Sequence, residues 1–198
     1  MIDRIPPQTY AVLDLPEPVA GRVMEIRRKH RDDFRSALPA EVTVVGSSGV
    51  GCFAEGQPAH NVFATLDRIA ATTQPIRTSL DGVIRFPNTD IFAFGFTDEA
   101  GLRNLHRRPV SRGSPSTTTL GRSSLTSLCG RVPPSPMKTP RASPTSASRT
   151  SSTLDQLSMY QLDEDPAGQA PVICKLLHRS RLGTSAPPGM KRRTTLLP

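Results

Sequence analysis

The segment A-E-V-T-V-V-G, residues 40–46, alternates apolar and polar side chains. A period of two is typical of a half-buried β-strand, because successive side chains on a strand point to opposite faces of the sheet. Glu41 and Thr43 are two residues apart, so we expect both side chains on the same face, and we expect this strand to be an inner strand of its sheet. This strand is the reference point from which the rest of the chain can be interpreted.

Periodic patterns lie on both sides of this strand. Residues 9–15 form a β-rich apolar run, which predicts a buried strand, and residues 17–30 place apolar side chains on one helical face. A second amphipathic helix is predicted around residues 62–70. Two strands at 76–86 and 90–96 and a short helix at 97–107, with Thr97 as its cap, complete the pattern. The order β-α-β-α-β-β-α indicates an α+β fold, with helices on one face of a mixed or antiparallel sheet.

The composition changes after this region. Residues 109–152 contain 26 Ser, Thr and Pro among 44 residues and carry neither an aromatic nor an acidic side chain. A segment of this kind buries too little apolar area to offset the entropy of ordering it, so we expect it to be disordered. Strand-like patterns return at 153–182, and residues 183–198 are expected to form a flexible basic tail.

The net charge of +8 is distributed unevenly. Residues 1–108 are neutral overall, whereas residues 109–150 have six basic side chains and no acid. The basic character therefore gives no support for nucleic-acid binding by the predicted folded region.

The remaining composition favours a cytoplasmic protein, and we expect it to be a monomer. Three widely spaced cysteines indicate neither a disulfide framework nor a zinc site. The first residues lack the pattern of a signal peptide, and no apolar run approaches the length of about 20 residues that a membrane span requires. We expect no contact with a membrane.

Residues 1–108 as a set resemble the two-histidine (2H) phosphoesterase superfamily, which includes the 2'-5' RNA ligases and cyclic phosphodiesterases. The resemblance rests on the order of three stretches, Y-A-V-L-D-L-P-E-P-V-A-G-R-V-M-E-I-R-R-K-H (10–30), L-P-A-E-V-T-V-V-G-S-S-G-V-G (38–51) and the run at 78–107. Residues 153–169 resemble the closing strand of the family. The resemblance implies that residues 1–108 are the first lobe of a two-lobed fold, followed by the disordered segment and one or two rejoined strands.

The resemblance also implies a site. In the family, two H-x-T motifs face each other across a cleft; the histidines act as acid and base, the threonines bind the phosphate, and no metal or other cofactor takes part. The first motif corresponds here to Glu41-Val42-Thr43. Glu41 and Thr43 are therefore the candidate catalytic residues, with glutamate in the place of histidine.

The second motif is expected within the anomalous segment, and our hypothesis is that the coding DNA is translated out of frame there. Read one base back, a TCN serine codon gives Phe, Leu, Ile or Val, and an ACN threonine codon gives Tyr, His, Asn or Asp. One permitted translation of residues 113–130 is I-P-F-D-D-N-P-W-P-F-K-P-H-F-T-L-R, in which the histidine codon spans Leu125 and Thr126. This hypothesis makes residues 109–152 a mistranslated second lobe.

The resemblance predicts action on 2'-5' or 2',3'-cyclic phosphate linkages, with RNA or a cyclic nucleotide as substrate, and an inactive chain in the present reading frame. The alternative is a non-enzymatic adaptor, in which a small α+β domain carries a basic, phosphorylatable Ser/Pro-rich linker.

Overall fold

A computed structural model describes residues 2–46, 52–85, 91–106, 130–131 and 151–183. The strands in these ranges are β1 (Thr9–Asp14), β2 (Glu41–Val45), β3 (Ile76–Arg85), β4 (Ile91–Phe96), β5 (Gly130–Arg131), β6 (Ser151–Leu154), β7 (Gln156–Asp163) and β8 (Ile173–Arg181). The helices are α1 (Val19–Lys29), α2 (Asp33–Ser36), α3 (Ala59–Ala71) and α4 (Ala100–His106).

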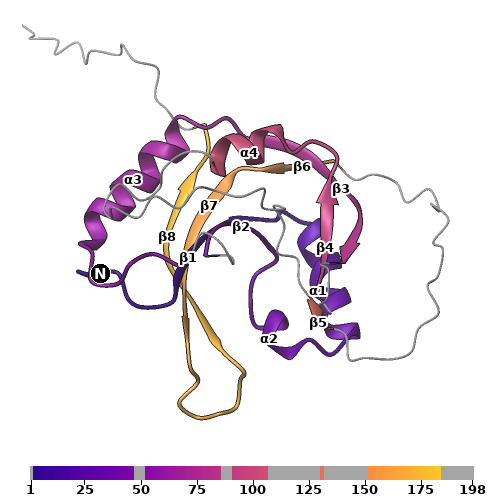
Figure 1. Ribbon diagram of the computed structural model, residues 1–198, viewed down its shortest axis with the longest axis horizontal. Helices are drawn as coiled ribbons and strands as arrows, with labels where there is room; N and C mark the ends of the chain where they lie inside the picture. The colour runs from indigo at the N-terminus through magenta and orange to yellow at the C-terminus, as the bar shows by residue number, and fades with distance from the viewer. Residues whose placement is uncertain (1, 47–51, 86–90, 107–129, 132–150, 184–198) are drawn as a thin grey trace, which may run out of the picture.

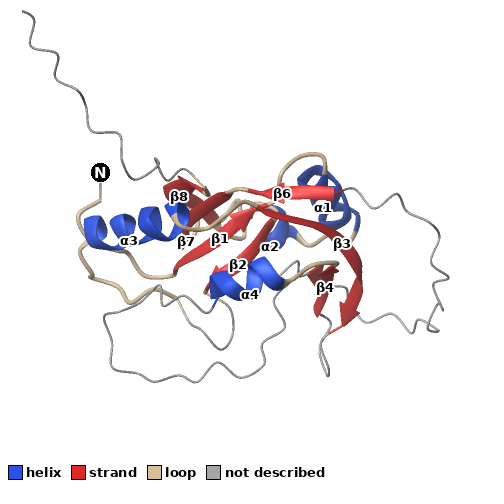
Figure 2. Ribbon diagram, turned by 90° about the horizontal axis from the view of Figure 1, so that it is seen from above, coloured by secondary structure: helices blue, strands red, loops and turns tan. Residues whose placement is uncertain are grey.

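The described strands form two four-stranded sheets (Figure 1). The first sheet has the order β2-β1-β7-β8 and the second has the order β5-β4-β3-β6. All of the pairings are antiparallel. Asp155 alone separates β6 from β7, so the chain passes directly from the second sheet into the first. Figure 2 shows α3 beside β7 and β8 at one end of the molecule, and β3 with β4 at the other.

Strand β1 lies between β2 and β7, and both of its faces are buried. Ala11 and Leu13 point into the large apolar core, while Tyr10 and Val12 belong to a smaller cluster with Tyr160 on the opposite face. This double burial accounts for the nearly continuous apolar character of the strand. It also makes the two faces of the first sheet different from each other.

Helices cover one of these faces. Val23 of α1, Leu66 of α3 and Leu105 of α4 all belong to the large core, together with Leu13 and residues of the second sheet. We call this side of the first sheet the core face. The opposite side, which carries Tyr10, Val12, Asp14, Glu41, Thr43, Ser158, Tyr160 and Arg179, is called the polar face.

Helix α1 contributes a buried charge as well as apolar packing. Val19, Val23 and Arg27 are its three buried residues, spaced four apart on one stripe of the helix. The Arg27 Nη1 group donates to the carbonyl oxygens of Arg35 at 2.8 Å, Leu38 at 3.0 Å and Pro39 at 3.0 Å. Arg27 therefore fixes the connection that leads into β2.

The predicted α+β class and the antiparallel alternative are confirmed. The order of elements through residue 106 is as expected, with the short helix α2 in addition. Residues 1–108 supply strands to both sheets, since β1 and β2 lie in the first and β3 and β4 in the second. The assignment of this range to a single lobe, like the other domain boundaries, stays a prediction.

The expected disorder of residues 109–152 falls mostly outside the described residues, as does the expected flexible tail beyond Gly183. Within that range, Gly130–Arg131 pairs with β4, and Ser151 and Ser152 belong to β6, which pairs with β3. At these four residues the chain differs from the expected disorder, because each supplies ladder partners to a longer strand.

The predicted cap of α4 is wrong. The Thr97 hydroxyl accepts a hydrogen bond from the backbone N–H of Ser79 across the β3–β4 ladder. The Asp98 carboxylate instead accepts from the backbone N–H of Ala100 at the start of the helix. The Thr97 hydroxyl bonds to the neighbouring strand, so it does not cap the helix. Asp98, the next residue, provides the cap.

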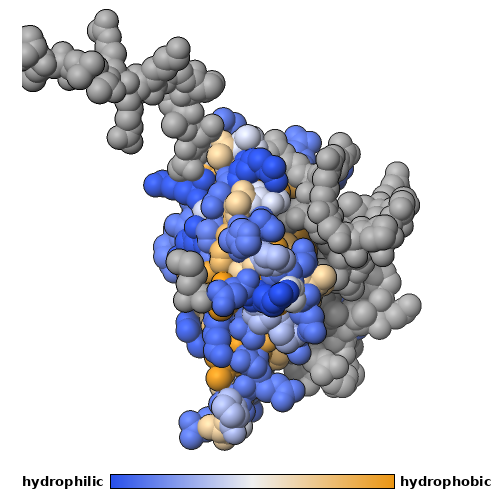
Figure 3. Space-filling view, turned by 90° about the vertical axis from the view of Figure 1, so that its left-hand side faces the viewer, coloured by the Kyte–Doolittle hydropathy of each residue, from blue (hydrophilic) through white to orange (hydrophobic). Residues whose placement is uncertain are grey.

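None of the helices within the described ranges is long and apolar enough to cross a membrane. The side of the molecule on which α3 lies is mostly hydrophilic, with smaller apolar areas between the polar ones (Figure 3).

Replacing Arg27 by methionine should lower the free energy of unfolding by roughly 2–4 kcal/mol, because three backbone carbonyls would lose their donor. Urea unfolding measures this change. Arg28→Met is the matched control: Arg28 is exposed on the same helix, so its loss should stay within about 0.5 kcal/mol. Equal losses for the two variants would contradict this role of Arg27.

Candidate functional site

Glu41 and Thr43 lie on β2 and point to the polar face. Glu41 is 2% exposed and Thr43 is 8% exposed. Their partners on β1 are Asp14 and Val12, respectively. Both residues therefore share one face, as their spacing predicted, although β2 is an edge strand of its sheet and not an inner one. Their catalytic role stays a prediction.

Burial dominates the electrostatics of Glu41. Desolvation raises its pKa from 4.5 to about 7, and the negative charge of Asp14 adds to the rise. The charges of Arg27 and Arg35 oppose it, as does the Tyr10 hydroxyl at 3.5 Å from Glu41 Oε2, the outer limit of a hydrogen bond. With its pKa raised into the neutral range, Glu41 can either donate or accept a proton.

The Tyr10 side chain lies between Glu41 on β2 and residues of β7 and β8. Its hydroxyl also lies 3.5 Å from Cys174 Sγ, and its ring centroid is 6.0 Å from that of Tyr160. Burial, with Glu41 next to it, raises the pKa of Tyr10 above its usual range. The phenol therefore remains protonated and acts as a hydrogen-bond donor beside the carboxyl group.

A second polar cluster occupies the other half of the polar face. Asp14 Oδ2 accepts from Ser158 Oγ at 2.5 Å and from Arg179 Nη2 at 3.0 Å, and Asp14 Oδ1 accepts from the Tyr160 hydroxyl at 3.1 Å. No local sequence pattern indicates this cluster. The spacing of Ser158 and Tyr160 placed them on one face, but only the pairing of β7 with β1 brings them to Asp14.

His106 reaches β2 from the end of α4. Burial lowers its pKa, and a hydrogen bond with the backbone of Thr43 opposes that shift. The His106 Nε2 atom is buried and has no hydrogen-bond partner among the described residues. The histidine thus packs against the edge of the candidate site.

The sequence contains one histidine that is followed two residues later by a hydroxyl residue, His178-Arg179-Ser180. His178 Nε2 lies 2.8 Å from Asp67 Oδ1 on α3, and Ser180 Oγ donates to the same oxygen at 2.6 Å. Both side chains therefore lie on the core-face side of the sheet. This pair cannot supply the missing second motif, because the sheet separates it from Glu41.

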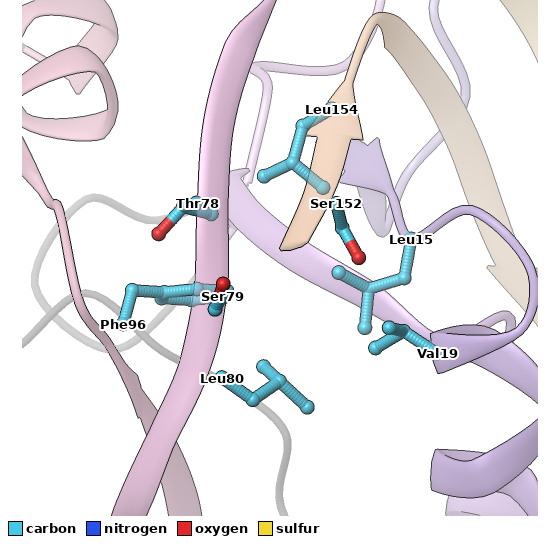
Figure 4. Close-up of a pocket in the computed structure, with 8 residues that line it drawn as sticks. All are labelled: Leu15, Val19, Thr78, Ser79, Leu80, Phe96, Ser152 and Leu154. Carbon is cyan, nitrogen blue, oxygen red and sulfur yellow. The ribbon is translucent and has the colours of Figure 1, made fainter. Parts of the chain in front are cut away.

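A mainly apolar pocket lies elsewhere, between the second sheet and the β1–α1 connection (Figure 4). Its lining consists of Leu15, Val19, Thr78, Ser79, Leu80, Phe96, Ser152 and Leu154. None of these side chains titrates, and neither Glu41 nor Thr43 is among them. The pocket therefore offers no acid–base chemistry. Over the part of the chain that is described, no group of three His, Cys, Asp or Glu side chains is arranged to hold a metal ion.

Neither a protein-family model nor a curated protein matches the chain. Several solved structures do match it. The protein TT0787 of Thermus thermophilus is 17% identical, covers 88% of this chain and 97% of its own, and superposes with a TM-score of 0.55. LigT of E. coli in its apo form is 15% identical with a TM-score of 0.54, covering 88% of this chain and 96% of its own.

A crystal structure described as a phosphoesterase is 15% identical with a TM-score of 0.57, covering 90% of this chain and 99% of its own. LigT has also been crystallised with 3'-AMP, NADP+, ATP and phosphate. The chain therefore shares the fold of these solved structures, one of which is a phosphoesterase.

Proposed function

We propose that this chain is a phosphoesterase of the two-histidine type in which Glu41 replaces the first catalytic histidine. Its ligand is an RNA end or cyclic nucleotide with a 2'-5' or 2',3'-cyclic phosphate linkage, bound by a cytoplasmic monomer. The observation that carries the proposal is the placement of Glu41 and Thr43 side by side on the buried polar face of β2. The ligands crystallised with LigT, which include 3'-AMP and phosphate, support a nucleotide-like ligand.

The protonation state of Glu41 decides whether it can act as an acid beside a phosphate. A carboxylate with its usual pKa would repel a phosphate and would have no proton to donate at neutral pH. With its pKa raised to about 7, Glu41 can take up and release its proton near that pH. The neutral form can stand beside a phosphate and donate a proton, and the Thr43 hydroxyl can bind a phosphate oxygen.

The second half-site is missing from the translated frame. The mechanism of the family requires an acid and a base on opposite sides of one phosphorus, and the only H-x-[ST] triplet of the sequence lies across the sheet from Glu41. General acid–base catalysis contributes roughly 10²–10⁴-fold, so a half-site alone leaves turnover close to background. The chain as translated therefore binds its ligand without hydrolysing it.

Binding and turnover are tested together. The full chain should bind 2',3'-cyclic AMP, detected by chemical-shift changes around Thr43, and should not hydrolyse it above background. Thr43→Val should weaken binding about tenfold through loss of one phosphate contact. Thr153→Val, on an exposed position of β6, is the control and should leave the affinity unchanged.

Clear, protein-dependent hydrolysis by the unaltered chain would overturn the claim that the site is incomplete. An affinity that is the same for Thr43→Val and the control would overturn the assignment of Thr43.

A repaired reading frame provides a second test. A chain in which residues 113–130 are encoded in the alternate frame should regain hydrolysis of 2',3'-cyclic AMP only to the extent that Glu41 can act. Adding Glu41→His to this repaired chain should then raise turnover. A folded repaired chain that gains nothing from the histidine would show that Glu41 does not occupy the acid–base position.

The raised pKa of Glu41 makes stability depend on pH. Glu41 binds its proton more tightly in the folded chain than in the unfolded one, so its contribution to stability is present below about pH 4.5 and is lost as the pH rises through about 7. The loss should amount to roughly 3 kcal/mol at most. In urea unfolding from pH 4.5 to 8, Glu41→Gln should therefore gain stability relative to the unaltered chain as the pH rises. Glu25→Gln, at an exposed position of α1, should show no such trend.

A further inference from the structure

One row of residues crosses the whole first sheet. Thr43 on β2 is paired with Val12 on β1, Val12 with Ser158 on β7, and Ser158 with Arg179 on β8. Thr43 and Arg179 therefore stand at the two ends of the row, three strand spacings or about 14 Å apart at their Cα atoms. Both belong to the polar face.

The side chain of Arg179 extends back along this row toward Thr43. Its Nε donates to Ser158 Oγ on β7 at 2.9 Å, and its Nη2 donates to Asp14 Oδ2 on β1 at 3.0 Å. The guanidinium group consequently stands over β7 and β1, between the Arg179 Cα and the Thr43 end of the row.

The hydrogen bonds of Arg179 leave one edge of the guanidinium available. An arginine has five N–H donors. Nε uses one on Ser158, and Nη2 uses two, on Asp14 and on the Tyr160 hydroxyl at 3.0 Å. Nη1 has no acceptor among the described residues, and the Arg179 side chain is 44% exposed. The two N–H groups of Nη1 can donate to the oxygens of a phosphate.

The three partners also fix the orientation of the guanidinium plane. Tyr160 donates to Asp14 Oδ1 and accepts from Arg179, and burial beside Asp14 raises the pKa of Tyr160 to about 12, which keeps its hydroxyl protonated. An arginine that is held in place before the ligand arrives loses little side-chain entropy on binding.

We propose that Arg179 binds a second phosphate group of the ligand, one nucleotide away from the phosphate at Thr43. The preferred ligand is then an oligonucleotide end and not a mononucleotide. This inference rests on the proposed function of the Glu41 and Thr43 site. The competing interpretation, an ion pair that only ties β8 to β1, makes no use of the Nη1 edge and predicts no effect on ligand length.

Calorimetry on the full chain separates the two interpretations. The probes are 2',3'-cyclic AMP and the dinucleotide ApA that ends in a 2',3'-cyclic phosphate. The unaltered chain should bind the dinucleotide at least about tenfold more tightly, because a hydrogen-bonded charge contact is added. Arg179→Gln should abolish this difference and leave the affinity for the mononucleotide unchanged. Arg68→Gln, at an exposed arginine of α3 on the opposite side of the sheet, should keep the difference.

The dependence of ligand affinity on salt concentration gives a second test. This dependence would not change if Arg179 had only a structural role. Each phosphate neutralised on a single strand makes the slope of log affinity against log salt more negative by about 0.7. Arg179→Gln should reduce the slope for the dinucleotide by about 0.7, whereas Arg179→Lys should keep the slope and lose part of the affinity. Should Arg179→Gln fail to fold, as judged by circular dichroism, Arg179→Lys decides the matter: a smaller dinucleotide preference with an unchanged slope supports the inference, and an unchanged preference overturns it.

The outcomes distinguish this inference from the function on which it rests. If neither probe binds the unaltered chain, the proposed function is wrong and this inference falls with it. If both probes bind with equal affinity, or if Arg179→Gln weakens both equally, Arg179 does not bind a second phosphate while the proposed function stands.

Discussion

The double burial of β1 is the constraint on which the rest of the structure depends. A strand that is covered on both faces has no room for a shift of one residue, because such a shift would move its core residues to the polar face and its polar residues into the core. Leu13 must face the helices, so Asp14 must face away from them. The pairing of β1 with β2 on one side and with β7 on the other then transmits this choice to Glu41 and Ser158.

The polar face combines two carboxyl groups whose surroundings differ. Asp14 accepts hydrogen bonds from three side chains, one of which is the cation Arg179. Glu41, directly opposite on the neighbouring strand, is almost completely buried and has the Tyr10 hydroxyl near it only at the limit of a hydrogen bond. A buried carboxyl group with few donors favours its neutral form. This difference in surroundings gives Asp14 three hydrogen-bond donors, whereas Glu41 exchanges its proton near neutral pH.

The first half of the fold could be predicted from the sequence because its signals are local. The alternation in β2, the apolar run of β1 and the helical stripes of α1 and α3 were visible, and the structure contains all four elements. The cap of α4 was assigned to the wrong residue, since the Thr97 hydroxyl is engaged by Ser79 on the neighbouring strand, 18 positions away. The Asp14 and Arg179 pair was not predicted for the same reason: 165 positions separate the two residues.

The sequence by itself determined that Glu41 and Thr43 share a face, because a period of two is a property of any strand. It also determined that glutamate and not histidine occupies the candidate acid–base position. Only the tertiary structure decided which face that is and how acidic the glutamate would be. The pKa of Glu41 depends on desolvation and on charges from α1, α2 and β1. Those elements come together only when the chain is folded, so no local pattern could have revealed their effect.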